Sequence, residues 1–161
     1  MRKKMLTTLY IILLVGTVIF SYNHRIAKRD GWSNYPTFNS GDIALYRVVR
    51  NKNDIHRYDF ISFYVDNNKK GYQLEKRVIG LPGEELIYDK GIIYVNGAKI
   101  DDKYCDKYGD ERYVKLKLAD DEYFVLGDNR PESVDSRDIG PIKYDWIKTK
   151  AIYTILKGKE R

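Results

Sequence analysis

The sequence predicts a mainly β protein, an antiparallel β fold tethered by a single N-terminal transmembrane helix. Three observations predict it. Near the N-terminus lies one long uncharged apolar run. The rest of the chain is a series of short segments rich in β-branched and aromatic residues, with polar turns between them. Outside the apolar run, no stretch keeps the 3.6-residue apolar period of an amphipathic helix. At 161 residues, the chain suits one domain with an appendage.

The apolar run extends without a charge from Leu6 to Phe20, and with its neighbours it covers residues 5–22. This length is at the short end of what a membrane-spanning helix needs. A secretory signal peptide has the same layout of basic residues followed by apolar ones. However, the end of the run offers no pair of small residues spaced for cleavage, so we expect an uncleaved anchor.

Basic residues lie on both sides of this run. Arg2, Lys3 and Lys4 precede it, and Arg25, Lys28 and Arg29 follow it. The leading cluster adjoins the run and has almost no chain to translocate, which favours a cytoplasmic N-terminus. We therefore expect residues 1–4 in the cytoplasm, residues 5–22 in the membrane and residues 23–161 outside the cytoplasm.

The strands are expected where β-branched and aromatic residues concentrate between turn residues. They are Ile43–Val49, Asp59–Val65, Gln73–Ile79, Glu85–Asp89, Gly91–Gly97, Arg112–Leu118 and Glu122–Gly127. Hairpin turns are expected within Tyr88–Ile92 and at Asn96-Gly97. The charged segment after Asn96 is expected to protrude into solvent, as part of a small cap-like insertion over about residues 88–122.

The composition limits the partners and cofactors of the protein. Its net charge of +6 is spread along the chain without an arginine-rich arm, so we expect no nucleic-acid binding. Attraction to the anionic lipid bilayer fits the charge better. The single cysteine, Cys105, cannot form an intrachain disulfide, and its acidic neighbours disfavour a thiolate. No cluster of His, Cys and carboxylate residues has ligand spacing, so we expect neither a metal nor a cofactor.

Three polar segments, residues 33–42, 76–84 and 127–141, look more specific than ordinary turns. The chain has only two histidines, His24 beside the membrane run and His56 in a turn-like stretch, and neither is well placed as a catalytic base. A serine nucleophile would therefore need a neutral lysine as its base.

Lys76 is a candidate for that base because it lies in an expected strand, where side chains alternate between faces. We expect Leu74, Lys76 and Val78 to face inward, and Glu75 and Arg77 to face outward. Burial lowers the pKa of a lysine, and a fall from about 10.4 to about 7 corresponds to roughly 4.6 kcal/mol. The residues alone leave open that Lys76 is a solvated strand residue and that the serines belong to ordinary loops.

The three segments, in this order and behind an anchor, resemble the type I signal peptidase family, whose motifs read Ser-Met-x-Pro-Thr, Lys-Arg-x-x-Gly-x-Pro-Gly-Asp and Gly-Asp-Asn-x-x-x-Ser-x-Asp-Ser-Arg. The second and third are nearly intact here. The resemblance covers roughly residues 31–155, and the single anchor and small size resemble the Gram-positive branch. It implies a signal-peptidase-like fold and a Ser/Lys serine protease.

The resemblance also implies roles for individual residues. Ser33 matches the nucleophile and Lys76 the general base. Ser133 matches a serine that hydrogen-bonds the lysine, Arg77 a structural arginine beside the base, and Asp135 and Arg137 an ion pair that holds the third segment. The remaining matches, at the start of that segment, are Gly127, Asp128 and Asn129.

The chain departs from the family pattern in several places. Asn34 replaces the usual Met after the nucleophile and, with Pro36, is expected at the substrate cleft. Gly31 stands where some members have a serine that stabilises the oxyanion, which leaves the backbone N–H of Ser33 for that role. Phe38, Tyr58 and Glu84 replace the usual Leu, Gly and Asp.

The implied reaction is removal of N-terminal signal peptides from exported preproteins, with small residues at positions −1 and −3 of the substrate. The alternative is a non-catalytic relative that serves as an assembly or chaperone factor for surface proteins. Because Ser33, Lys76 and Ser133 are all present, the active enzyme is favoured. A self-cleaving repressor is disfavoured by the anchor and by the lack of a DNA-binding domain.

Overall fold

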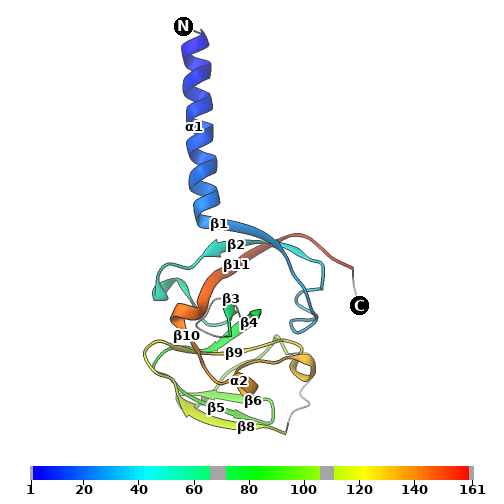
Figure 1. Ribbon diagram of the computed structural model, residues 1–161. Helices are drawn as coiled ribbons and strands as arrows, with labels where there is room; N and C mark the ends of the chain where they lie inside the picture. Colours follow the sequence, from blue (N-terminus) through cyan, green and yellow to red (C-terminus); the bar gives the residue numbers. More distant parts are fainter. Residues whose placement is uncertain (1, 66–71, 106–110, 160–161) are drawn as a thin grey trace.

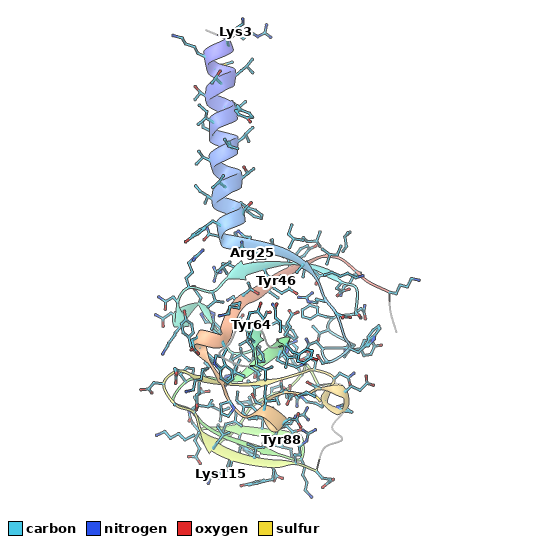
Figure 2. The ribbon with its side chains drawn as sticks, viewed as in Figure 1. Lys3, Arg25, Tyr46, Tyr64, Tyr88 and Lys115 are labelled. Carbon is cyan, nitrogen blue, oxygen red and sulfur yellow. The ribbon has the colours of Figure 1, made fainter. Side chains whose placement is uncertain are left out.

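A single long helix, α1 (Arg2–Asn23), projects from the β structure that forms the rest of the protein (Figure 1). The computed structural model describes residues 2–65, 72–105 and 111–159. Within those ranges α1 is the one helix long and apolar enough to cross a membrane. None of its residues is buried, and its side chains point outward from Lys3 at the far end to its foot beside Arg25 (Figure 2). The expected span of residues 5–22 lies within it.

The strand that follows the helix opens a seven-stranded sheet with the order β1-β2-β11-β3-β4-β9-β10. All of its pairings are antiparallel. The strands are β1 (His24–Lys28), β2 (Ile43–Val48), β3 (Phe60–Tyr64), β4 (Gln73–Gly80), β9 (Glu122–Leu126), β10 (Ile142–Lys143) and β11 (Ile147–Leu156).

A smaller sheet of four strands lies at the end away from α1 (Figure 1), in the order β7-β6-β5-β8. Its strands are β5 (Glu85–Asp89), β6 (Ile92–Val95), β7 (Ala98–Lys99) and β8 (Tyr113–Lys117). Both predicted hairpin turns are confirmed, since Lys90-Gly91 and Asn96-Gly97 have positive φ at both residues, as tight two-residue hairpins require.

The fold class and all seven expected strands are confirmed, with small differences at the strand ends. Strands β1, β7, β10 and β11 were not predicted. Two of these, β7 and β10, are only two residues long, and β1 reads in sequence as the basic flank of the membrane run. The ten-residue β11 lacks a clean alternation of buried and exposed residues, since half of its residues are partly buried and four are exposed.

The expected protrusion after Asn96 needs correction. The smaller sheet runs from Glu85 to Lys117 rather than over residues 88–122, and its buried cluster is shared with the larger sheet through Ile79, Phe124 and Leu126. Asp102, in the charged segment, is only 7% exposed. Residues 106–110 of that segment lie outside the described part of the chain.

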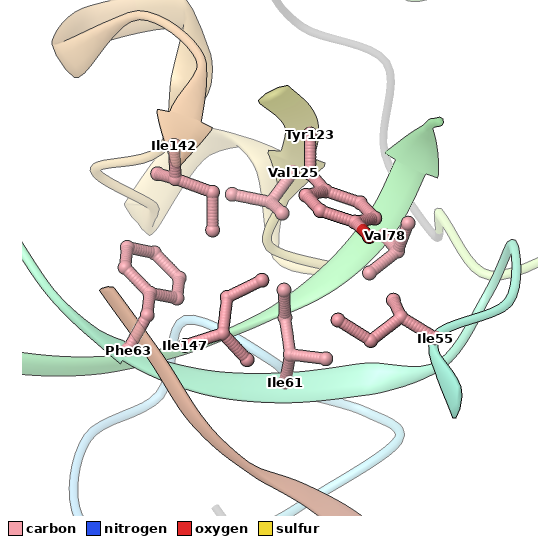
Figure 3. Close-up of a cluster of buried hydrophobic side chains, with 8 residues drawn as sticks. All are labelled: Ile55, Ile61, Phe63, Val78, Tyr123, Val125, Ile142 and Ile147. Carbon is pink, nitrogen blue, oxygen red and sulfur yellow. The ribbon is translucent and has the colours of Figure 1, made fainter. Parts of the chain in front are cut away.

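Two buried apolar clusters hold the sheets together. The first (Figure 3) consists of Ile55, Ile61, Phe63, Val78, Tyr123, Val125, Ile142 and Ile147. The second consists of Ile79, Leu86, Tyr88, Ile93, Val95, Leu118, Phe124 and Leu126. Successive residues of β4, Val78 and Ile79, belong to different clusters, so this part of the strand is buried on both faces.

Candidate active site

Ser33 lies in the loop between β1 and β2, and the third polar segment holds this loop in place. The backbone N–H of Asn129 donates to the Ser33 carbonyl oxygen at 3.0 Å. The Asn129 side chain donates to the carbonyl oxygen of Trp32 at 3.1 Å. These bonds fix the backbone on both sides of the Ser33 amide, while its side chain stays half-buried.

Lys76 reaches Ser33 from β4, and its Nζ lies 2.5 Å from Ser33 Oγ. The lysine is only 2% exposed. Burial lowers the pKa of Lys76 to about 8, although the charges of Asp135 and Glu75 oppose this shift. A neutral amine can accept a proton, so the same contact can carry a proton from Ser33 to Lys76.

The predicted alternation of β4 is only partly correct. Lys76 faces inward as expected, but Glu75 and Arg77 do not face solvent. Arg77 is 4% exposed. The reason is that other side chains cover this face of β4. Arg29 and Tyr46 contact the Glu75 carboxylate. The rings of Phe60 and Tyr104 lie over the Arg77 guanidinium. A buried strand can hold charged residues only where each finds a partner.

The partner of Arg77 is Asp128. Arg77 Nε and Nη2 donate to the two carboxylate oxygens of Asp128 at 2.8 and 2.7 Å. Asp128 also accepts from the Thr37 hydroxyl, in the Ser33 loop. This bidentate pair therefore joins β4, which carries the lysine, to both loops of the site.

A second buried ion pair shapes the third segment. Asp135 caps the short helix α2 (Ser136–Ile139) and accepts from Arg137 Nε at 2.8 Å. The same carboxylate accepts from the backbone N–H of Gly127 at 3.0 Å. Both side chains of the pair are fully buried. The predicted Asp135–Arg137 pair is thus present, and it fixes the backbone at Gly127.

Gly127 is required by the close approach of the two loops. A Cβ atom at this position would overlap the Ser33 carbonyl oxygen and the Ser133 hydroxyl. The hydrogen atom of glycine leaves the room that the Ser33 loop occupies.

The predicted hydrogen bond between Ser133 and Lys76 is not present. Ser133 is buried, but its Oγ has no hydrogen-bond partner among the described residues. Instead, the hydroxyl lies against Gly127. Lys76 is oriented toward Ser33 without it.

Several buried polar residues of the site were not predicted. Arg29, which reads as part of the basic membrane flank, is 7% exposed and forms an ion pair with Glu75 at 3.1 Å. Its guanidinium also lies 3.4 Å above the ring of Phe38. The hydroxyl of Tyr46 donates to Glu75 at 3.0 Å. No local pattern could reveal this group, because its members come from separate strands and loops.

A second unpredicted group ties the segment after Asn96 to the site. Asp102 forms a buried ion pair with Arg130, and Arg130 Nε donates to the Gly127 carbonyl oxygen at 3.0 Å. Tyr58 supports the same segment, since its hydroxyl donates to the Asp101 carbonyl oxygen at 2.9 Å. Tyr58 has a φ of +73°, a conformation that glycine adopts without strain. Tertiary contacts therefore hold a tyrosine where glycine is easier.

A small cleft of about 70 Å³ adjoins Ser33 and Lys76. Asn34 lines it, as predicted, together with Arg29, Phe38 and Glu75. Pro36 is exposed and does not line it, which corrects the prediction that it belongs to the cleft. The chain turns outward at Pro36 before Thr37 returns to Asp128.

A wider hollow of about 440 Å³ shares Arg29, Asp30 and Gln73–Glu75 with this cleft and continues to β1. Since β1 follows α1 directly, the two hollows form a groove from the foot of the membrane helix to Ser33. Among the residues that the structure describes, no group of His, Cys, Asp or Glu is arranged to hold a metal ion.

This arrangement, a serine in contact with a buried lysine at the end of a groove, defines a Ser/Lys hydrolase site. Residues 2–156 match the family model of signal peptidase, peptidase S26, and the chain belongs to this family. The N-terminal helix is its membrane anchor.

The relatives and a solved structure agree with this assignment. A signal peptidase I of Bacillus caldolyticus is 38% identical over 86% of this chain and 82% of its own length. Signal peptidase I V of Bacillus subtilis is 35% identical over 72% of this chain and 76% of its own length. A crystal structure of a signal peptidase I from Enterococcus faecalis has 31% sequence identity and a TM-score of 0.50, covering 58% of this chain and 92% of that one.

Proposed function

We infer that this protein is a membrane-anchored serine endopeptidase that removes N-terminal signal peptides from exported preproteins. The observation that carries this conclusion is the contact between Lys76 Nζ and Ser33 Oγ, in a chain of the signal peptidase family. The alternative of a non-catalytic assembly factor is not favoured, because both residues are present and in contact.

In the proposed mechanism, neutral Lys76 takes the proton of the Ser33 hydroxyl as its oxygen attacks the scissile carbonyl carbon. The backbone N–H of Ser33 stabilises the resulting oxyanion. Protonated Lys76 then returns its proton to the leaving amine, and an acyl-enzyme remains on Ser33. Lys76 next takes a proton from a water molecule as it attacks the acyl carbon. Lys76 then returns this proton to Ser33 Oγ as the acyl–oxygen bond breaks, which releases the new C-terminus and restores the free enzyme.

The proposed substrate binds in an extended conformation along the free edge of β4 at Gln73–Lys76. An added strand directs alternate side chains to the same face, so residues −1 and −3 enter the same wall of the groove. The small volume of the cleft beside Ser33 supports small residues at those positions.

We further propose that residues 1–4 lie in the cytoplasm and that residues 23–161 form the catalytic domain on the other side of the membrane. The groove begins at β1, directly after α1, where the chain would emerge from the bilayer. A signal peptide leaves the bilayer at that level, so its cleavage site would reach Ser33 in an extended conformation.

The test is cleavage of an exported preprotein by the detergent-solubilised full chain. Ser33→Ala and Lys76→Ala should each lower kcat/KM by at least about a thousandfold. The matched controls are Ser40→Ala, in the same loop, and Lys99→Ala, an exposed lysine on β7; both should cleave normally. Normal cleavage by either dyad variant would refute the mechanism.

A further inference from the structure

Asn34 follows the serine nucleophile and is almost completely buried, at 8% exposure. Its Nδ2 donates to the Glu75 carbonyl oxygen at 2.8 Å. Because that carbonyl can only accept, the amide cannot be reversed, and the other end of the carboxamide must be the oxygen. This oxygen, Oδ1, is buried and has no hydrogen-bond partner among the described residues.

The Glu75 carbonyl points away from β3, toward the side of β4 that β9 pairs with only from Arg77 onward. Val78 directs its N–H to Asp59 and its carbonyl to Tyr58, so its polar groups point toward the β3 side. Backbone polar groups alternate in direction along a strand, so Glu75, at an odd spacing from Val78, points the opposite way.

On that opposite side, pairing with β9 begins only at Arg77, which is opposite Leu126. The register of Gln73–Lys76 involves β3 alone. This edge of β4 is therefore open to an added strand at Glu75. The Glu75 carbonyl oxygen, however, already accepts a hydrogen bond from Asn34.

We propose that Asn34 is a specificity-determining residue whose carboxamide relays strand pairing from β4 to the bound signal peptide. The amide N–H satisfies Glu75, and Oδ1 accepts a backbone N–H of the peptide close to the scissile bond. A primary amide carries the same donor and acceptor as a peptide group, so it can stand between two strands as one inserted peptide unit. This role rests on the proposed function.

The relay has a consequence for substrate choice. A buried acceptor without a partner is unfavourable, so a peptide that supplies the missing N–H is preferred over one that lacks it. The enzyme therefore selects signal peptides with an N–H at that backbone position. Proline, which has no backbone N–H, is rejected there.

The test combines a change in Asn34 with a change in the peptide. In a cleavable signal peptide, the backbone N–H of residues −1, −2 and −3 is replaced in turn by an ester oxygen, and kcat/KM is measured with the full chain in detergent. For one of these esters, the wild type should lose roughly tenfold relative to the all-amide peptide. Asn34→Leu, similar in size but without an acceptor, should cleave that ester and the all-amide peptide equally well.

The controls separate this role from folding and from the proposed function. Asn53→Leu, an exposed asparagine in the 3₁₀ turn Lys52–Asp54, should keep the wild-type preference. If Asn34→Leu fails to unfold cooperatively, Asn34→Ala makes the same comparison. An equal ester penalty in wild type and variant, or none in either, overturns the role of Asn34. Failure of the wild type to cleave the all-amide peptide refutes the proposed function and this inference with it.

Discussion

Replacement of Lys76 by methionine tests the electrostatic cost of burying the lysine ammonium group, which folding removes from water. Methionine has a similar length and no charge, so Lys76→Met removes the desolvation cost and keeps most of the packing. The variant should be inactive, yet more stable than the wild type at neutral pH.

The magnitude follows from the pKa of Lys76, which burial lowers from 10.5 to about 8. Each unit corresponds to about 1.4 kcal/mol, so the protonated lysine costs the folded state about 3 kcal/mol. Below pH 8 both the folded and the unfolded chain are protonated, and the full cost applies. Between pH 8 and 10.5 only the unfolded chain binds the proton, so wild-type stability recovers as the pH rises.

The methionine also loses the hydrogen bond to Ser33, worth about 1 kcal/mol. The net gain of Lys76→Met should therefore be about 2 kcal/mol at pH 7 and close to zero at about pH 9.5. Lys115→Met, at an exposed position of β8, should change stability little at either pH.

The assay is urea unfolding of the full chain in detergent, followed by the fluorescence of Trp32 and Trp146, at several pH values from 6 to 9.5. The stability difference between variant and wild type is the quantity of interest, since it cancels the titration of other groups. A Lys76→Met chain less stable than the wild type at pH 7, or a difference that does not change with pH, would refute the reasoning.

Three further predictions concern the same machinery. The kcat/KM of the wild type should rise with pH through about 8, as Lys76 loses its proton, and a profile flat from pH 6 to 10 would contradict Lys76 as the base. Gly127→Ala should lower stability by about 1–3 kcal/mol and impair cleavage, because the new methyl group overlaps the Ser33 carbonyl; unchanged thermal unfolding and activity would exclude this packing. Asp102→Ala should lower the free energy of unfolding by about 3–5 kcal/mol, because it leaves Arg130 buried without its partner. Adding Arg130→Met should restore much of this stability in urea unfolding. No restoration would show that the loss of the ion pair is not the cause.

Much of the fold could be predicted because its signals are local. The uncharged apolar run predicts a helix, since a helix satisfies its own backbone hydrogen bonds in an apolar environment. Asn96-Gly97 and Lys90-Gly91 set two hairpins, because both residues of each turn need positive φ. Strand β11 was not predicted because its buried and exposed residues do not alternate. Its place between β2 and β3 also depends on residues far away in sequence.

The candidate site also has features that the sequence predicted and features that it did not. The family resemblance predicts that Ser33 and Lys76 meet, and the structure brings them together. It does not predict that Ser133 lies against Gly127 without a bond to the lysine, since the close packing of residues distant in sequence decides which groups touch.

The sequence by itself therefore predicted the apolar helix and the hairpins, because each depends on residue type and short spacing, and its resemblance to a known family pointed to Ser33 and Lys76. Only the tertiary structure decided which charges are buried. Arg29 reads as a solvated membrane flank until Glu75, on another strand, supplies the opposite charge. A charge is buried only where a partner satisfies it, and local sequence does not show a partner that is distant in the chain.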